Sequence, residues 1–182
     1  MFQNVSLSLL QRFSTDRKGV AALEYALIAP MMFMLLFVSF ELTDALSASN
    51  RAERAAGAIA DVIARDVLVS DAEVADVLAA VPWITHPTPG EHVRSRITSI
   101  FVNASGQASV VWSEGSGMAA LPVGAIVTLP GGMLVPETGL IMGETQMDYR
   151  PPLGLYSASA FTINKTEYRR SRIMDPIERF AG

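Results

Sequence analysis

The chain has 182 residues, half of them hydrophobic, and a formal net charge of −4. It contains no cysteine, which excludes disulfide bonds, thiolate catalysis and cysteine-based zinc sites. The charge is divided unevenly: residues 1–19 carry a net +2, so the remainder carries −6. This acidic remainder gives no electrostatic basis for binding nucleic acid.

Residues 20–40 form an almost wholly apolar run with one charged side chain, Glu24. At about 1.5 Å per helical residue the run extends about 30 Å, which matches the hydrocarbon core of a bilayer. Basic side chains precede it and acidic ones follow it, so the positive-inside rule predicts a cytoplasmic N-terminus. The run is also too long for the apolar region of a secretory signal. We therefore expect a cytoplasmic leader over 1–19, a retained transmembrane helix over 20–40 and an exterior domain over 41–182.

Glu24 is costly inside such a span, by roughly 2.5–3.5 kcal/mol at the bilayer centre and less near an end. Two explanations remain open. In one, a peptidase cuts after Gly19, and the new ammonium group of Val20 lies four residues from Glu24 on the same helix face. In the other, the helix is uncut and the carboxylate is stabilised by the helix dipole and by headgroup water.

The residues around Gly19 resemble a known processing signal. Arg-Lys-Gly19 followed by Val-Ala-Ala-Leu-Glu24-Tyr25 is similar to the type IVb prepilin signal of Flp pilins, in which the cut follows the glycine. The whole stretch over 17–50, including Glu41 after the apolar run, resembles the TadE/TadG-like family of tight-adherence (Tad) pilus assembly.

The resemblance implies a minor pilin or pseudopilin, which is not an enzyme and uses no cofactor or metal. It implies a prepilin peptidase that cuts between Gly19 and Val20, with Glu24 and Tyr25 acting in assembly and in pairing with the N-terminus. The other implied partners are the Tad assembly platform, other minor pilins, the major Flp pilin and the bacterial inner membrane. The exterior domain would be periplasmic, with incorporation into an extracellular pilus as a further fate. The alternative is an uncleaved single-span envelope protein whose exterior domain is a protein-interaction module.

The helix should continue beyond the membrane. Residues 41–66 lack proline, and their apolar side chains recur at helical spacing, which predicts one rod from about residue 20 to 67. Pro30 lies within the span, where it removes a backbone donor and predicts a helix kink near Ala26.

A second, shorter helix follows. Ser70 and Glu73 form a capping box, which predicts a helix that begins there, runs to about Ala80 and is stopped by Pro82. The proline-rich residues 82–91 are expected to form a loop that holds Trp83 against the core.

Several later segments have the composition and alternation of strands. They are 96–102 and 108–113 as a hairpin, 125–129, 140–150, and 160–173 as a strand or short helix. Together these elements predict an α+β fold in which an antiparallel sheet of about three to five strands packs on the long helix, a pilin-like lollipop.

No catalytic or metal site follows from the sequence. His86 and His92 flank an acid in the proline-rich loop, but their spacing is not that of a metal site, so we interpret them as surface histidines. The chain has no nucleophile elbow and no phosphate-binding loop. The basic patch at 169–172 is either a solvated surface of mixed charge or a contact for an acidic partner.

Overall fold

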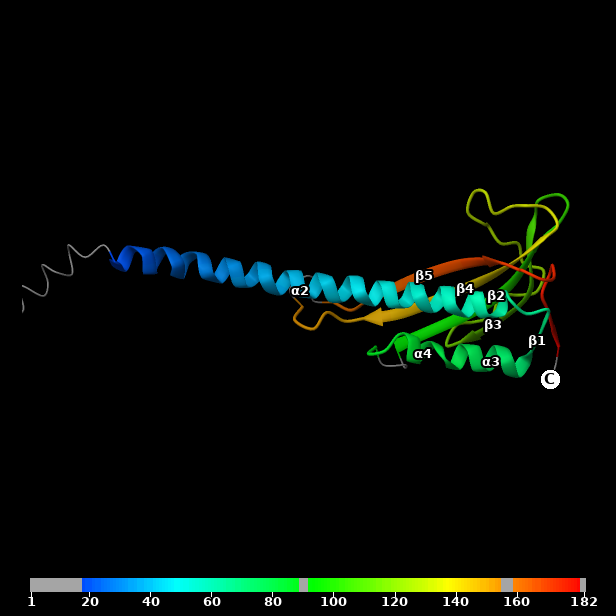
Figure 1. Cartoon of the computed structure of the whole chain (residues 1–182), viewed down its shortest axis with the longest axis horizontal. Helices are drawn as coiled ribbons and strands as arrows, with labels where there is room; N and C mark the ends of the chain where they lie inside the picture. The colour runs from blue at the N-terminus through cyan, green and yellow to red at the C-terminus, as the bar shows by residue number, and fades with distance from the viewer. Residues whose placement is uncertain (1–17, 89–91, 155–158, 181–182) are drawn as a thin grey trace, which may run out of the picture.

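The computed structural model describes residues 18–88, 92–154 and 159–180. Most of the predicted leader over 1–19 therefore lies outside the described residues. The first described element is a single long helix, α2 (Lys18–Ile63). Its second half lies along a small α+β domain, and its first half extends away from that domain (Figure 1). The predicted fold class, a long apolar helix followed by an antiparallel sheet, is confirmed.

Helix α2 runs for 46 residues without interruption and passes through Pro30. It ends at Ile63, four residues before the expected end near Val67. Beyond residue 40 its buried hydrophobic positions follow helical spacing and are mostly alanine; they are Ala48, Ala52, Ala55, Ala56, Ile59, Ala60 and Ile63. This stripe of small side chains lets the helix axis approach the sheet closely.

Two short helices follow. Helix α3 (Asp71–Ala79) begins with the predicted capping box, because the Ser70 hydroxyl accepts the Glu73 N–H while the Glu73 carboxylate accepts the Ser70 N–H. Helix α3 ends at Ala79, close to the predicted end near Ala80, but the loop expected from Pro82 onward begins with a helix. Pro82 lies in the first turn of this further helix, α4 (Val81–Ile84), where proline needs no backbone donor.

The main sheet has four antiparallel strands in the order β3-β2-β4-β5. They are β2 (Val93–Val102), β3 (Ala108–Ser116), β4 (Thr138–Tyr149) and β5 (Phe161–Arg170). The predicted hairpin forms β2 and β3, and the segment left open between strand and helix is the strand β5. Residues 125–129 are not a strand of the sheet; they only flank β3, to which Ile126 forms an isolated bridge.

A second, two-stranded sheet was not predicted. It pairs β1 (Leu68–Ser70) with β6 (Glu178–Phe180) in parallel. Each strand has only three residues, and they are far apart in the sequence, so neither has a local pattern that marks it as a strand. The pairing ties the end of the described chain to the segment that leaves α2.

The sheet has apolar side chains on both faces. The face covered by the helices holds the main core, which includes Ile59 and Ile63 of α2, Val74 and Leu78 of α3, Ile97 of β2 and Ile141 of β4. On the opposite face a smaller cluster lies under the segment between β3 and β4; it includes Ile100, Val102, Leu129, Leu140 and Met142.

Helix α2 and strand β4 pack at very short range. A Cβ placed on Gly143 of β4 would lie 2.2 Å from the Ala56 carbonyl oxygen and 3.0 Å from the Ile59 side chain. Two residues further along β4, on the same face of the strand, the Thr145 hydroxyl donates a hydrogen bond of 2.8 Å to the Ala52 carbonyl oxygen. The absence of a side chain at Gly143 is therefore what permits this distance between helix and sheet.

We expect Gly143→Ala to destabilise the domain by about 1–3 kcal/mol, the usual cost of overpacking a core. Alanine normally stabilises a strand relative to glycine, so a loss of stability in this variant would come from the close packing and not from strand propensity. Urea unfolding of the full chain in detergent micelles measures it. Gly131→Ala is the matched control, because a Cβ there has no atom within 4 Å. Equal stability of the two variants would contradict the close packing at Gly143.

Candidate functional site

The first half of α2 is apolar on all sides and stands apart from the domain. From Leu23 to Phe37 its large apolar side chains are exposed by between 45% and 77%. In the described part of the chain one helix, Gly19–Ile63, is long and apolar enough to cross a membrane, with a mean hydropathy of 2.0 over its most apolar window. Such a surface is stable in contact with lipid or with other apolar helices rather than with water. The helix suggests a single-pass membrane protein.

The predicted processing and assembly residues all lie in the first turns of this helix. Gly19 is within α2, and among the described residues no side chain or other segment lies within 4 Å of the position a Cβ would take there. Val20, Glu24 and Tyr25 are all exposed. The four-residue spacing of Val20 and Glu24 places them one turn apart on the same face.

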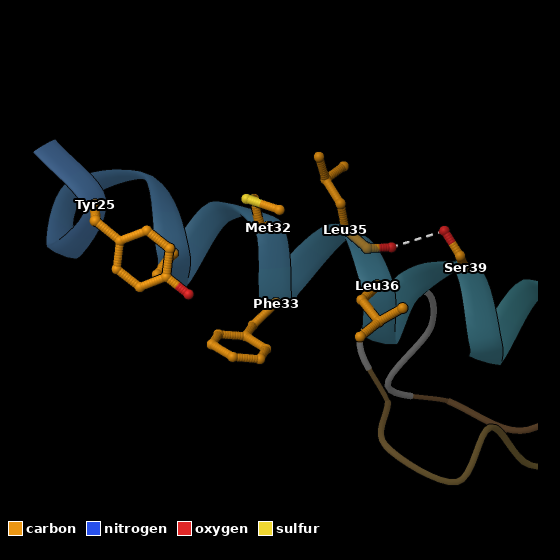
Figure 2. Close-up of a pocket in the computed structure, with 7 residues that line it drawn as sticks. Tyr25, Met32, Phe33, Leu35, Leu36 and Ser39 are labelled. Carbon is orange, nitrogen blue, oxygen red and sulfur yellow. Dashed lines mark hydrogen bonds between the residues drawn. The ribbon is translucent and has the colours of Figure 1, made fainter.

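A shallow groove of about 470 Å³ follows the apolar half of the helix. Figure 2 shows that its labelled side chains point away from the helix, Phe33 and Leu36 to one side and Leu35 to the other. All of its lining residues belong to α2, so the groove is open rather than enclosed. The Ser39 hydroxyl donates to the Leu35 carbonyl oxygen at 2.7 Å, which satisfies this polar group within the helix (Figure 2).

The exterior domain contacts α2 through hydrogen bonds directly after the apolar run. Glu41 is only 3% exposed, and its carboxylate accepts the Leu153 N–H at 2.8 Å. One turn further on, Asp44 accepts a hydrogen bond of 2.7 Å from the Tyr149 hydroxyl. We call these four residues the collar. Because a buried carboxylate is stable only with hydrogen-bond partners, Glu41 fixes the chain after β4 against the helix.

The surroundings of Tyr149 keep its phenol protonated, so that its hydroxyl can donate the hydrogen bond to Asp44. Burial raises the pKa of its phenol above the usual value, and the hydrogen bond to Asp44 and the charges of Asp44 and Glu41 act in the same direction. The folded chain therefore holds this proton more tightly than the unfolded chain does. The resulting stability is fully present below the ordinary tyrosine pKa of about 10 and is lost as pH rises above it.

Ion pairs join the outer edge of the sheet to α2. Lys165 of β5 pairs with Glu53 at 3.0 Å, and Arg172 pairs with Asp61 at 2.6 Å. Arg169 pairs with Glu167. Two arginines of the basic patch are therefore engaged within the chain, as in a surface of mixed charge. Each exposed pair contributes little by itself, but the set fixes which side of α2 faces β5.

A cavity of about 430 Å³ lies between α2 and the end of β4. Its charged lining combines Arg51 and Arg150 with Asp44 and Asp148, and His92 also lines it. This mixture of charges defines no single ligand class. Among the residues that the structure describes, no group of three or more His, Cys, Asp or Glu side chains is placed to hold a metal ion.

The collar is the part of the site that sequence reasoning missed. Glu41 was noted as an acid after the apolar run and as part of the family resemblance, but neither observation indicates that its side chain is buried. Its partner Leu153 lies 112 residues away and contributes a backbone N–H, for which no residue type is required.

The fold and the helix together define a class: an α+β protein carried on one apolar N-terminal helix, with the sheet docked on the polar continuation of that helix. A comparison with protein families gives the more particular assignment. Residues 19–61 match the family model described as TadE-like protein, which supports assigning the chain to the TadE-like family. This family suggests a Tad pilus-associated protein with pilus-assembly partners. Comparisons with curated proteins and with solved structures gave no match.

We expect Glu41→Ala to lower the free energy of unfolding by about 1–3 kcal/mol, because the Leu153 N–H loses the buried carboxylate that accepts its hydrogen bond. Glu41→Gln should cost less, since its amide oxygen can still accept that bond. Urea unfolding gives the stabilities, and hydrogen exchange at the Leu153 amide should accelerate in the alanine variant. Glu53→Ala, which removes only an exposed ion pair, should change stability by at most about 1 kcal/mol. Unchanged exchange at Leu153 in Glu41→Ala would refute the role of the collar.

Proposed function

We propose that this protein is a minor pilin or pseudopilin that takes part in assembly of a Tad-type (Flp) pilus. The observation that carries the proposal is the division of α2 into two halves. One half is apolar, exposed and long enough to span a bilayer, while the other is docked on a folded domain. A subunit built in this way can be stored in a membrane by its helix and can later pack that same helix among others in a filament.

The proposed topology follows from the charges. The basic residues before the span keep the N-terminus cytoplasmic, so the domain over 41–182 is periplasmic and the span over 20–40 crosses the inner membrane. Removal of the leader over 1–19 by a prepilin peptidase would delete these basic residues. The mature helix would then keep only the ammonium group of Val20 as positive charge on the cytoplasmic side, in place of three basic side chains, which favours its withdrawal from the membrane during assembly.

Cleavage would also change the electrostatics of the span. It would create an ammonium group on Val20, close to the Glu24 carboxylate on the same face. Either charge left alone near apolar surroundings is costly, so each favours a partner. In a bundle of such helices the ammonium group of one subunit can pair with the glutamate of its neighbour, with Tyr25 adding apolar contact area beside it.

In this proposal the protein is a substrate of the peptidase and a structural subunit, not an enzyme. Its partners would be the prepilin peptidase, the assembly platform, other minor pilins and the major pilin.

A second candidate is an uncleaved single-span envelope protein whose domain binds another protein. One observation favours it. Trp83, expected to pack on the core, is instead 83% exposed on α4, and exposed tryptophans are common at the centres of protein interfaces.

The two candidate functions differ in whether the leader over 1–19 is removed by cleavage after Gly19. We expect the mature protein in its native host to begin at Val20, and Gly19→Leu to abolish this processing, because a bulky side chain should not fit a peptidase subsite that takes glycine. Intact-mass spectrometry of the membrane-extracted protein measures both. Gly131→Leu, at an exposed turn between β3 and β4, is the control and should still be processed. Wild-type protein that retains residues 1–19 in cells with an active prepilin peptidase would exclude the pilin assignment.

Glu24→Gln tests assembly apart from cleavage. It keeps the shape of the side chain but removes its charge, so processing should continue while incorporation beside other subunits falls, since the incoming ammonium group loses its partner. Co-purification with the other pilus components, with processing checked in parallel, measures this. Glu53→Gln is the matched control in the exterior half of the helix. Normal assembly of processed Glu24→Gln would restrict Glu24 to a role within its own helix.

A further inference from the structure

The chain that follows β4 returns to α2 at the end of the apolar run. We call residues 150–154 the boundary turn. Its Leu153 N–H donates to the Glu41 carboxylate at 2.8 Å, and Glu41 is the first residue after the apolar run. Figure 1 shows the orange chain after β4 lying beside this part of the helix. The exterior domain therefore has a segment at the level where α2 leaves the membrane.

The direction of the Glu41 side chain fixes the depth of the contact. Side chains on an α-helix tilt toward its N-terminus, which for α2 is the direction of the bilayer. Residues 20–40 already account for about 30 Å of hydrocarbon, and the headgroup layer adds roughly 5–8 Å on each side. Because Leu153 is bonded to a carboxylate that points back toward the hydrocarbon, it lies within the headgroup layer rather than above it.

The side chains at this level suit a lipid surface. Leu153 is 57% exposed although its backbone is held by a buried group. Leu42 and Leu46 of α2 are exposed in the first turns after the run. Arg150, in the same turn as Leu153, is exposed and can place a cation among lipid phosphates. Apolar side chains beside cations at headgroup depth are typical of segments that lie in a membrane interface.

We propose that the boundary turn is a second membrane contact, in which Leu153 inserts into the leaflet that faces the domain and the lipid surface is its partner. The contact sets the orientation of the domain, because the turn lies on one side of the helix only. The proposal rests on the membrane span of the proposed function, but not on cleavage or on pilus assembly.

A fluorescent label at a single cysteine tests the contact, because the natural chain has no cysteine. Leu153→Cys is labelled with an environment-sensitive nitrobenzoxadiazole dye in the full chain. The protein is reconstituted at high dilution in vesicles of phosphatidylethanolamine and phosphatidylglycerol, with or without lipids that carry a nitroxide near the top of the acyl chain. Val123→Cys is the matched control. Val123 is 75% exposed and belongs to the segment between β3 and β4. Figure 1 shows loops of this segment at the end of the domain far from the apolar half of α2.

The proposal expects the label at position 153 to emit at shorter wavelength than the label at position 123, and to be quenched several-fold more strongly by the nitroxide lipids. Flotation of the same samples on a density gradient reports the membrane span independently. Protein that floats with its vesicles, but whose label at 153 is quenched no more than that at 123, would overturn the second contact and leave the span intact. Emission at short wavelength without quenching, growing with protein density, would overturn it in favour of contact with another chain. Protein that does not float would overturn the span and the proposal with it.

Discussion

The close packing of α2 on β4 is the constraint on which the rest of the structure depends. Four helical residues advance about 6 Å and two strand residues about 6.6 Å, so the two elements stay nearly in step over several turns. The contacts follow this step, from Ala56 with Gly143, through Ala52 with Thr145, to Asp44 with Tyr149. Small side chains on both elements bring the backbones together, and the Thr145 hydroxyl then satisfies a helix carbonyl that the sheet covers. The positions of β2 and β5 follow from that of β4.

Elements with strong local signals could be predicted from the sequence. The apolar run, the capping box at Ser70 and the hairpin around residues 103–106 all depend on residues close together in the chain, so their patterns report them directly. The short strands β1 and β6 could not be predicted, because three-residue segments stabilised by a distant partner leave no local pattern. Helix α4 could not be predicted for a related reason: a proline that stops one helix can also lie in the first turn of the next, and the local pattern shows only the stop.

In the candidate site, too, some residues could be predicted from the sequence and others could not. Gly19, Glu24 and Tyr25 could be singled out because a charge in an apolar run is conspicuous, and because their spacing resembles a processing signal. The collar could not, since the importance of Glu41 depends on a backbone N–H contributed from beyond β4. An acid after a membrane span normally indicates only where the span ends. Here the fold buries it, and burial gives an ordinary boundary residue a structural role.

The continuity of α2 across the boundary has a mechanical consequence. No flexible linker separates the apolar half from the docked half, since one helix runs from Lys18 to Ile63. A force that pulls the apolar half along its axis is therefore carried into the domain as shear along the length of the helix–strand interface. Its contacts, from the buried Glu41 carboxylate to the Gly143 packing, share the load at the same time rather than breaking one after another. Because one helix joins the two halves, a rotation imposed on the apolar half is transmitted to the docked half and reorients the exterior domain with it.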